Sequence, residues 1–405
     1  MGRAALAVSL AAPGESLSAP GESLSAAGGV NFFFFGPLCH APLLALVLGH
    51  AVAPEVAVLP GRAVFWAEGQ AFPLIVPDAG GRALGVLLRD LDPQDIARLE
   101  FYAGSFAELS SEVAVEVGAE VARARLFVPD QAAWQLGRRW LLADWQAQFG
   151  AAAVAAAGDF MAQFGLKPGG EVRARYAAML ARGASRVRAS DADAGVLRHR
   201  AGPQDVAVLA QREPYARFFA VEEYDLRFRR FDGTLSREVL RAAFISADAV
   251  TVLPYDPLRD RVLLIEQFRV GPFARGDRQP WQVEVIAGRI DAGESPEAAA
   301  RREAVEEAGL HLGALLPVAS YYPSTAAVSE YLYSYVGLCD LPDGVAGVFG
   351  VAHEAEDIRG HLISFDALMA LLSSGEVANA PLILTALWLQ RERPRLRGLA
   401  GAGPA

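Results

Sequence analysis

Three carboxylates that could act together lie in one short segment of the chain. Glu303, Glu306 and Glu307 stand at spacings of three and four residues, so a helix would place them on one face. Like charges this close repel one another, and an unaided fold gains nothing from the arrangement. Clusters of oxygen ligands suit hard cations such as Mg²⁺ or Mn²⁺. The spacing therefore indicates a divalent-metal site, and the alternative is a solvated acidic helix face.

The neighbouring residues predict the helix that would carry these carboxylates. Ser295 stands at the N-cap position, Pro296 follows at the first helical position, and Gly309 lies just past the end. Alanine and glutamate, both good helix formers, fill most of the segment between them. Glu294, immediately before the helix, is placed to pair with Arg302 and to hold the preceding loop against it.

The whole segment resembles the Nudix box, the signature of the Nudix hydrolases. Gly288, Glu294 and the run Arg302-Glu303-Ala304-Val305-Glu306-Glu307-Ala308-Gly309-Leu310 fill every fixed position of that pattern. The resemblance implies hydrolysis of a pyrophosphate, whose charge must be neutralised while water attacks one phosphorus. Divalent metals neutralise that charge and lower the pKa of a bound water. The implied cofactor is Mg²⁺, with Mn²⁺ as an alternative.

Four segments outside the metal-binding glutamates indicate a branch of the family. They are Ile265-Glu266-Gln267-Phe268-Arg269, the stretch 281–288, Tyr321-Tyr322-Pro323-Ser324, and His353-Glu354-Ala355-Glu356-Asp357-Ile358. Together they look like the ADP-ribose pyrophosphatase branch, which cleaves ADP-ribose to AMP and ribose 5-phosphate. Thr325-Ala326 follow the Pro-Ser pair where the family commonly has a glycine, so a related nucleoside diphosphate sugar stays open as the substrate.

The resemblance implies a role for each matching residue. The implied metal ligands are Glu303, Glu307, Glu356 and the carbonyl of Ala287. The implied catalytic residues are Arg302, Glu306 and Glu354, with Glu354 as the base for the attacking water and Glu306 as an alternative base or a ligand to a further metal. The implied substrate-binding residues are Arg269 at the phosphates, Glu284 or Glu330 at the ribose, and Ser324 near the terminal sugar. Without the resemblance, Arg269 is a surface arginine and Glu354 and Glu356 are a solvated acidic loop.

Length and composition limit the number of domains, the kinds of partner and the cellular compartment that the sequence allows. A chain of 405 residues predicts two domains, and a formal net charge of -10 argues against a nucleic-acid partner. Cys39 and Cys339 are too far apart in sequence to indicate a disulfide framework, so a reducing, cytoplasmic setting is expected. The apolar stretch 32–49 reaches membrane-spanning length, but glycine, prolines and a histidine interrupt it. It predicts a buried strand turning into a helix, and no membrane partner.

The N-terminal half carries a second resemblance. Phe34-Phe35-Gly36-Pro37-Leu38 and Leu99-Glu100-Phe101-Tyr102-Ala103-Gly104 are similar to motifs of the γ-glutamylcyclotransferase-like (AIG2-like) family, a small β-barrel with helices. Members usually have a glutamate at the position of Ala103, where it acts as general acid and base. Because alanine cannot move a proton, the resemblance predicts a binding or structural module. A cyclotransferase acting on glutathione or a peptide is the less favoured alternative.

The predicted fold class is α/β (α+β), with a C-terminal Nudix α/β/α sandwich preceded by a small β-barrel domain and a helical linker. The predicted boundaries are a disordered low-complexity tail at 1–29, the cyclotransferase-like domain at 30–130, a helical connector at 131–195, the Nudix domain at 196–395 and a disordered tail at 396–405. This domain order is similar to that of fusion proteins associated with tellurite resistance, although no residue argues for tellurite chemistry.

Assembly and two rival functions follow from the resemblance. Family members usually share the adenine pocket across a homodimer, so the segment 215–245 is a predicted dimer interface. The first rival is a Nudix hydrolase of another nucleoside diphosphate sugar or a dinucleotide, which nothing in the sequence excludes. The second is a sensor that binds ADP-ribose without cleaving it. A sensor predicts a damaged box, whereas Glu303, Glu306 and Glu307 are all present.

Overall fold

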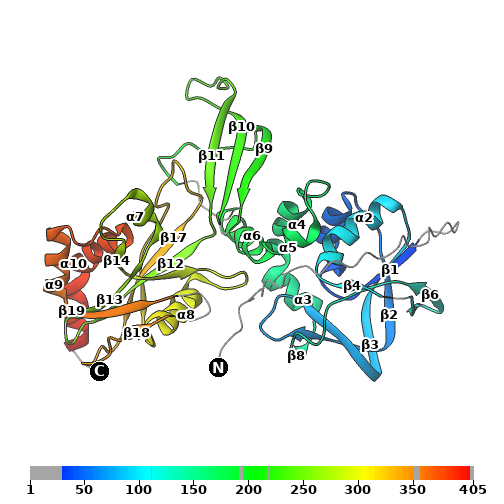
Figure 1. The fold of residues 1–405 in the computed structure, drawn as a ribbon, viewed down its shortest axis with the longest axis horizontal. Helices are drawn as coiled ribbons and strands as arrows, with labels where there is room; N and C mark the ends of the chain where they lie inside the picture. Colours follow the sequence, from blue (N-terminus) through cyan, green and yellow to red (C-terminus); the bar gives the residue numbers. More distant parts are fainter. Residues whose placement is uncertain (1–29, 111, 191–194, 218, 351–355, 402–405) are drawn as a thin grey trace. The chain divides into compact units, whose positions relative to one another are not determined.

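A computed structural model of the chain describes residues 30–110, 112–190, 195–217, 219–350 and 356–401 (Figure 1). The tail predicted at 1–29 and the predicted base Glu354 lie outside these residues. The chain divides into two compact units, Met1–Ser190 and Asp191–Ala405. Among the described helices, none combines the length and the apolar character needed to cross a bilayer.

A curved antiparallel sheet forms the core of the first unit. Its strands are β1 (Val30–Phe34), β2 (Glu55–Ala67), β3 (Pro73–Leu91), β5 (Val113–Val117), β6 (Glu120–Ala124) and β8 (Leu136–Arg139). They follow the order β1-β3-β2-β5-β6, with β8 on β2. The N–H of Phe33 donates to the carbonyl of Arg125 (2.8 Å), and the N–H of Arg125 donates to that of Asn31 (2.9 Å). These two bonds link β1 back to the residue after β6, and the sheet curls around an apolar core.

Helices cover this sheet, and the order of a strand and then a helix predicted for 32–49 is confirmed by β1 and α1 (Ala41–Leu48). Asp92 caps α2 (Pro93–Tyr102) by accepting from the N–H groups of Gln94 and Asp95, both at 2.8 Å. The remaining elements are η1 (Pro37–Cys39), η2 (Ala103–Ser105), β4 (Glu108–Leu109), β7 (Phe127–Val128), α3 (Leu142–Trp145), the π-helix η3 (Gln146–Gly150), α4 (Ala151–Met161), α5 (Gly169–Arg173) and α6 (Tyr176–Ser190).

The second unit begins with a three-stranded antiparallel sheet. Its strands are β9 (Val206–Ala216), β10 (Ala220–Phe228) and β11 (Val239–Ile245), in the order β11-β10-β9. The dipeptide Asp232-Gly233 lies in the turn between β10 and β11, and Gly233 has a φ of 83°. The left-handed backbone there favours glycine. The strand β9 was not predicted.

An eight-stranded mixed sheet follows. Its strands are β12 (Ala249–Asp256), β13 (Arg261–Phe268), β14 (Trp281–Glu284), β15 (Ile286–Arg289), β16 (Leu315–Tyr321), β17 (Leu332–Leu338), β18 (Val348–Phe349) and β19 (Ile358–Ser364). The order is β16-β17-β12-β13-β19-β18, with β14 on β13 and β15 on β12. The strands β12 and β13 pair only where Tyr255 and Asp256 meet Val262 and Arg261. Beyond that point β15 pairs with β12 and β14 with β13, so the sheet splits in two directions.

Helices lie on both faces of this sheet, which confirms the predicted sandwich. On one face, α8 (Pro296–Ala308) packs on Val250, Val252 and Leu263. On the other face, α9 (Phe365–Ser374) and α10 (Ala380–Gly401) pack on Leu253 and Leu264. The alternation of side chains along β12 and β13 supplies both cores. The short helix α7 (Val270–Arg275) follows β13, and α10 continues to Gly401, into the segment predicted as a tail.

Candidate active site

The helix α8 begins and ends where the capping residues predicted. The hydroxyl oxygen of Ser295 accepts from the N–H of Ala298 at 3.2 Å, and Gly309 has a φ of 63°. The N–H of Gly309 donates to the carbonyl of Val305 (3.0 Å), and that of Leu310 donates to Ala304 (2.9 Å). These two backbone hydrogen bonds are typical of a helix that ends at a glycine in the left-handed conformation. Alanines on the inner face are fully buried, so the helix approaches the sheet closely.

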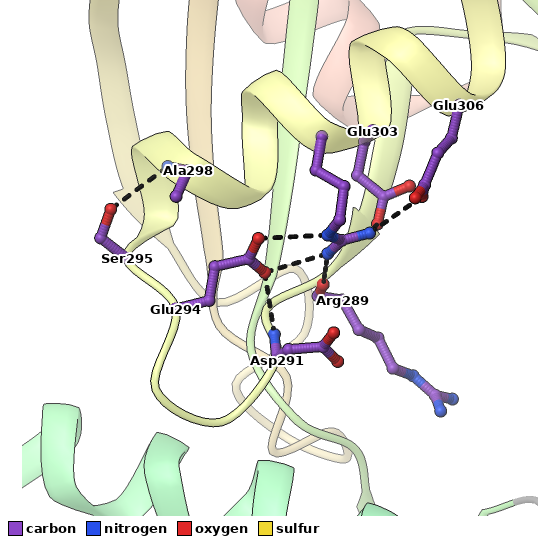
Figure 2. Close-up of polar contacts among 8 residues, drawn as sticks. Arg289, Asp291, Glu294, Ser295, Ala298, Glu303 and Glu306 are labelled. Atoms are coloured by element: carbon purple, nitrogen blue, oxygen red, sulfur yellow. Dashed lines mark hydrogen bonds and ion pairs between the residues drawn. The ribbon is translucent and has the colours of Figure 1, made fainter. Parts of the chain in front are cut away.

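The predicted pair between Glu294 and Arg302 is confirmed, and it ties the preceding loop to the helix (Figure 2). Arg302 Nε lies 3.1 Å from Glu294 Oε1, and Nη2 lies 3.0 Å from Oε2. The same Nη2 donates to the carbonyl of Arg289 at 2.9 Å, and the N–H of Asp291 donates to Glu294 at 3.2 Å. One guanidinium therefore holds the end of β15, the loop and the helix together.

Arg302 also contacts two of the three helical glutamates. Its Nη1 lies 2.6 Å from Glu303 Oε1 and 3.1 Å from Glu306 Oε2 (Figure 2). Burial opposes the charge on Arg302, but Glu294 and Glu303 outweigh burial and raise its pKa. A guanidinium held charged in this way orients carboxylates and does not release a proton. The side chain of Glu306 is 41% exposed, whereas that of Glu303 is 12% exposed.

Glu303 and Glu307 are the buried members of the acidic group. A Cβ placed on Gly288 would lie 1.9 Å from Glu303 Oε1, so this carboxylate occupies the space that a side chain at 288 would fill. Glu307 Oε2 accepts from the N–H of Ala287 at 3.0 Å. Burial raises the pKa of Glu303 to about 7 and that of Glu307 to about 8, and Arg302 opposes the first shift. Both carboxylates therefore extend from α8 to contact β15, beside the point where the sheet splits.

The predicted metal ligands converge on this point. Ala287 pairs with Thr251 of β12, and its N–H contacts Glu307. The charge of Glu356 contributes to the raised pKa values of both Glu303 and Glu307, so it lies within electrostatic reach of them. Within the described ranges, no group of three or more His, Cys, Asp or Glu already stands in a metal-binding arrangement. The donor set itself, buried carboxylate oxygens with a neighbouring backbone carbonyl, fits a hard divalent cation.

Arg269 lies opposite the helix, at the end of β13. Its Nε and Nη2 lie 2.9 and 2.7 Å from Glu284 Oε2, and Asn379 Nδ2 donates to Glu284 Oε1 at 3.2 Å. Burial opposes the charge on Arg269, but Glu284, Glu307 and Glu356 outweigh it and raise its pKa. The structure therefore places Glu284 as the ion-pair partner of Arg269. Asn379 stands immediately before α10, and sequence reasoning gave it no role, because its contact with Glu284 joins distant parts of the chain.

Two further predicted residues are Glu330, which lies just before β17, and Ser324, which lies in the loop after β16. Glu330 Oε1 accepts from the hydroxyl of Ser246 at 3.4 Å. Burial raises the pKa of Glu330, and Ser246, Arg289 and Arg269 oppose that shift. Glu330 therefore lies within electrostatic reach of Arg269, while Ser324 is exposed and its carbonyl accepts from Ala327 and Val328. Sequence reasoning did not identify Arg289 as a site residue. Its position directly after Gly288, at the start of the Nudix box, could have indicated that it lies near the site.

Comparison with known proteins agrees with this geometry. Residues 246–384 match the NUDIX domain family model, and residues 32–147 match the model described as Gamma-glutamyl cyclotransferase, AIG2-like. A sandwich whose central helix carries a carboxylate cluster near a half-buried arginine is the architecture of a Nudix pyrophosphatase. The chain belongs to the Nudix family and carries an AIG2-like domain ahead of its Nudix domain.

Three curated bacterial relatives are each similar to about half of the chain. The ADP-ribose pyrophosphatase of Escherichia coli strain K12 is 39% identical over 196 residues, which are 48% of this chain and 93% of the relative. The ADP-ribose pyrophosphatase of Haemophilus influenzae is 32% identical over 48% of this chain and 90% of the relative. The GDP-mannose pyrophosphatase of Escherichia coli strain SMS-3-5 is 26% identical over 46% of this chain and 96% of the relative.

Proposed function

We propose that this protein hydrolyses the diphosphate bond of ADP-ribose, giving AMP and ribose 5-phosphate, and that the reaction depends on Mg²⁺. The observation that carries the proposal is the convergence of Ala287, Glu303, Glu307 and Glu356 near the half-buried cation of Arg269. A diphosphate needs both a metal for its charge and a cation for its orientation. The ADP-ribose pyrophosphatases of two bacteria, at 39% and 32% identity, support the choice of substrate.

The metal would be held by Glu303, Glu307, Glu356 and the carbonyl of Ala287. When bound, it would neutralise phosphate charge and lower the pKa of a bound water. Burial of Glu303 and Glu307 favours this occupancy, because desolvation raises the pKa of each carboxyl and a bound cation would stabilise its charged form.

The chain's own residues supply orientation and proton transfer. Arg269 binds the diphosphate, and its bond to Glu284, itself held by Asn379, fixes the guanidinium in place. Arg302 holds Glu303 against β15. Glu354 is the proposed base for the attacking water, and the partly exposed Glu306 is the alternative.

Incubation with Mg²⁺ and ADP-ribose, GDP-mannose, UDP-glucose, ADP-glucose, NADH or diadenosine pyrophosphate tests the proposal. Chromatography of the products should show AMP released fastest from ADP-ribose, and the variant Glu306→Gln, Glu307→Gln should lose this activity. The 26% identical GDP-mannose pyrophosphatase makes GDP-mannose the most informative competitor. Faster cleavage of another compound would replace the substrate and keep the Nudix chemistry. Binding of ADP-ribose without cleavage of any compound would favour the sensor.

We also infer that the Nudix domain forms a homodimer through the sheet β9–β11. Apolar side chains are exposed on this sheet: Val208 is 54%, Leu240 55% and Tyr215 48% exposed. Apolar surface gathered on a small sheet is typical of a surface that another protein covers. The exposed segment includes 215–245, the interface that the family resemblance implies.

A further inference from the structure

Gln267 is a buried polar residue of the Nudix domain that has no part in the proposed reaction as described by the residues above. The side chain of Gln267 on β13 is only 7% exposed, and its Nε2 has no hydrogen-bond partner among the residues that the structure describes. An amide N–H group taken out of water without a partner destabilises a fold. A buried donor without a protein partner can be satisfied by a bound ligand or an ordered water.

Strand geometry places Gln267 in the floor of the candidate site. Side chains alternate along β13, and both Leu263 and Ile265 belong to the core under α8. Gln267 follows on the same face, and Arg269 comes next on that face. Trp281 to Glu284 flank this end of β13 on one side, where Gln282 pairs with Gln267.

The strand β19 lies on the other side of β13 and forms the rest of the surroundings of Gln267. In the antiparallel pairing of β13 with β19, Ile265 lies opposite Gly360 and Glu266 opposite Arg359. Continuing that register puts Gln267 opposite Ile358 and Arg269 opposite Glu356. The effect of Glu356 on the pKa of Arg269 agrees with this placement. The amide of Gln267 therefore lies between the apolar core and the charged group formed by Arg269, Glu307 and Glu356.

We propose that Gln267 is a further substrate-binding residue, whose Nε2–H group donates to an oxygen of the bound diphosphate. This inference rests on the proposed function as far as the diphosphate class, and it does not depend on which nucleotide is cleaved. Three nearby carboxylate oxygens already accept hydrogen bonds: those of Glu284 from Arg269 and Asn379, and Glu307 Oε2 from the N–H of Ala287. The acceptors that enter beside Arg269 are phosphate oxygens, and a neutral donor binds them without adding a charge to the cluster.

The variant Gln267→Met tests the proposal, because methionine has a similar volume and no donor. We expect kcat/KM to fall about tenfold or more, the effect of one lost hydrogen bond to a charged group. The melting temperature of the substrate-free protein should rise by about 2 °C, because a buried unpaired donor has been removed. The variant Gln267→Glu places a carboxylate next to the phosphates, so we expect a larger loss of activity.

Gln282→Met is the matched control. Gln282 lies directly across from Gln267 on β14, but its Nε2 donates to the carbonyl of Gln279 at 2.8 Å. We expect this variant to melt at a slightly lower temperature and to keep the kcat/KM of the wild type. A Gln267→Met protein that melts lower than the wild type, or one that keeps its kcat/KM, would overturn the proposal.

The kinetic comparison uses whichever diphosphate compound the wild type cleaves fastest, so the two proposals fail separately. If the wild type prefers GDP-mannose, ADP-ribose is rejected as the substrate, and a loss of GDP-mannose turnover in Gln267→Met still supports the role of Gln267. If the wild type cleaves none of the compounds, the proposed function fails. The melting temperature of Gln267→Met then tests the role of Gln267. A lower melting temperature than the wild type would show that the amide stabilises the fold, and a higher one would support its role in binding a ligand.

Discussion

Gly288 shows how a single missing side chain shapes the metal-binding carboxylates. A Cβ at this position would lie 1.9 Å from Glu303 Oε1, so the variant Gly288→Ala must displace the carboxylate. Because a displacement of about 1 Å at a reacting centre costs roughly a hundredfold in rate, we expect kcat/KM to fall by about that factor. Steady-state kinetics with saturating Mg²⁺ measures the loss.

Gly398→Ala is the control for this prediction. A Cβ on Gly398 meets nothing within 4 Å, and the residue lies inside α10, where alanine is the better helix former. Unchanged kinetics and equal or higher stability are expected. Wild-type activity in Gly288→Ala would show that the position of Glu303 is not critical.

The pKa values of Glu303 and Glu307 predict how stability depends on pH. Burial raises them from the ordinary value of 4.5 to about 7 and about 8, so the folded protein binds these protons more tightly than the unfolded chain does. Stability that comes from the protonated carboxyls is fully present below about pH 4.5 and is lost as pH rises through 7 to 8. We expect the chelator-treated protein to melt lower at pH 8 than at pH 6.

Glu307→Gln isolates this effect from other titrating groups. The amide has no proton to lose, so the variant should show a smaller fall in melting temperature between pH 6 and pH 8 than the wild type does. Addition of Mg²⁺ at pH 8 should raise the melting temperature of the wild type more than that of Glu307→Gln. Equal pH profiles for the two proteins would contradict the assignment.

At the scale of elements, the cap of α8 links stability to activity. Ser295 accepts from the N–H of Ala298 at 3.2 Å, and Ser364 makes the same kind of bond to Ala367 at 3.1 Å at the start of α9. Replacing either serine with alanine should lower the free energy of unfolding by about 1 kcal/mol. Only Ser295→Ala should also lower kcat, because its helix carries the carboxylates. Denaturant unfolding and kinetics of both variants check this, and equal kcat values would refute it.

The split between β12 and β13 is the element-scale feature that makes the site. Because β15 and β14 pair with diverging strands, they bring Ala287 and Glu284 to the same region from two directions. A sheet that paired continuously would leave no gap for the carboxylates of α8. The local sequence signals strands here but does not reveal that they diverge.

At the scale of the whole molecule, the inferred homodimer gives a direct prediction. Leu240 on β11 is 55% exposed, and an aspartate there would put a charge into the inferred interface. Sedimentation velocity should show a dimer for the wild type and a shift towards monomer for Leu240→Asp. Val121→Asp is the control, because Val121 is 66% exposed on β6 of the other unit. A monomeric wild type, or a fully dimeric Leu240→Asp, would exclude this interface.

Local chemistry made much of this protein predictable. Ser295, Pro296 and Gly309 set the ends of α8 through bonds within a few residues of each other, so their meaning could be read directly from the sequence. The pair of Glu294 and Arg302 also spans a short distance in sequence. By contrast, the apolar side chains of β9 are exposed, and their pattern in the sequence does not separate a strand from a loop.

The sequence by itself determined the family, the two-part order of the chain and the helix with its three glutamates, because each depends on spacing along the backbone. The tertiary structure decided which distant groups meet. Glu284 pairs with Arg269, Asn379 reaches Glu284 from the residue before α10, and Glu356 lies just before β19. The Nε2 group of Gln267 is buried without a hydrogen-bond partner among the residues that the structure describes. Strand register and burial set these contacts, and neither is a property of any one segment.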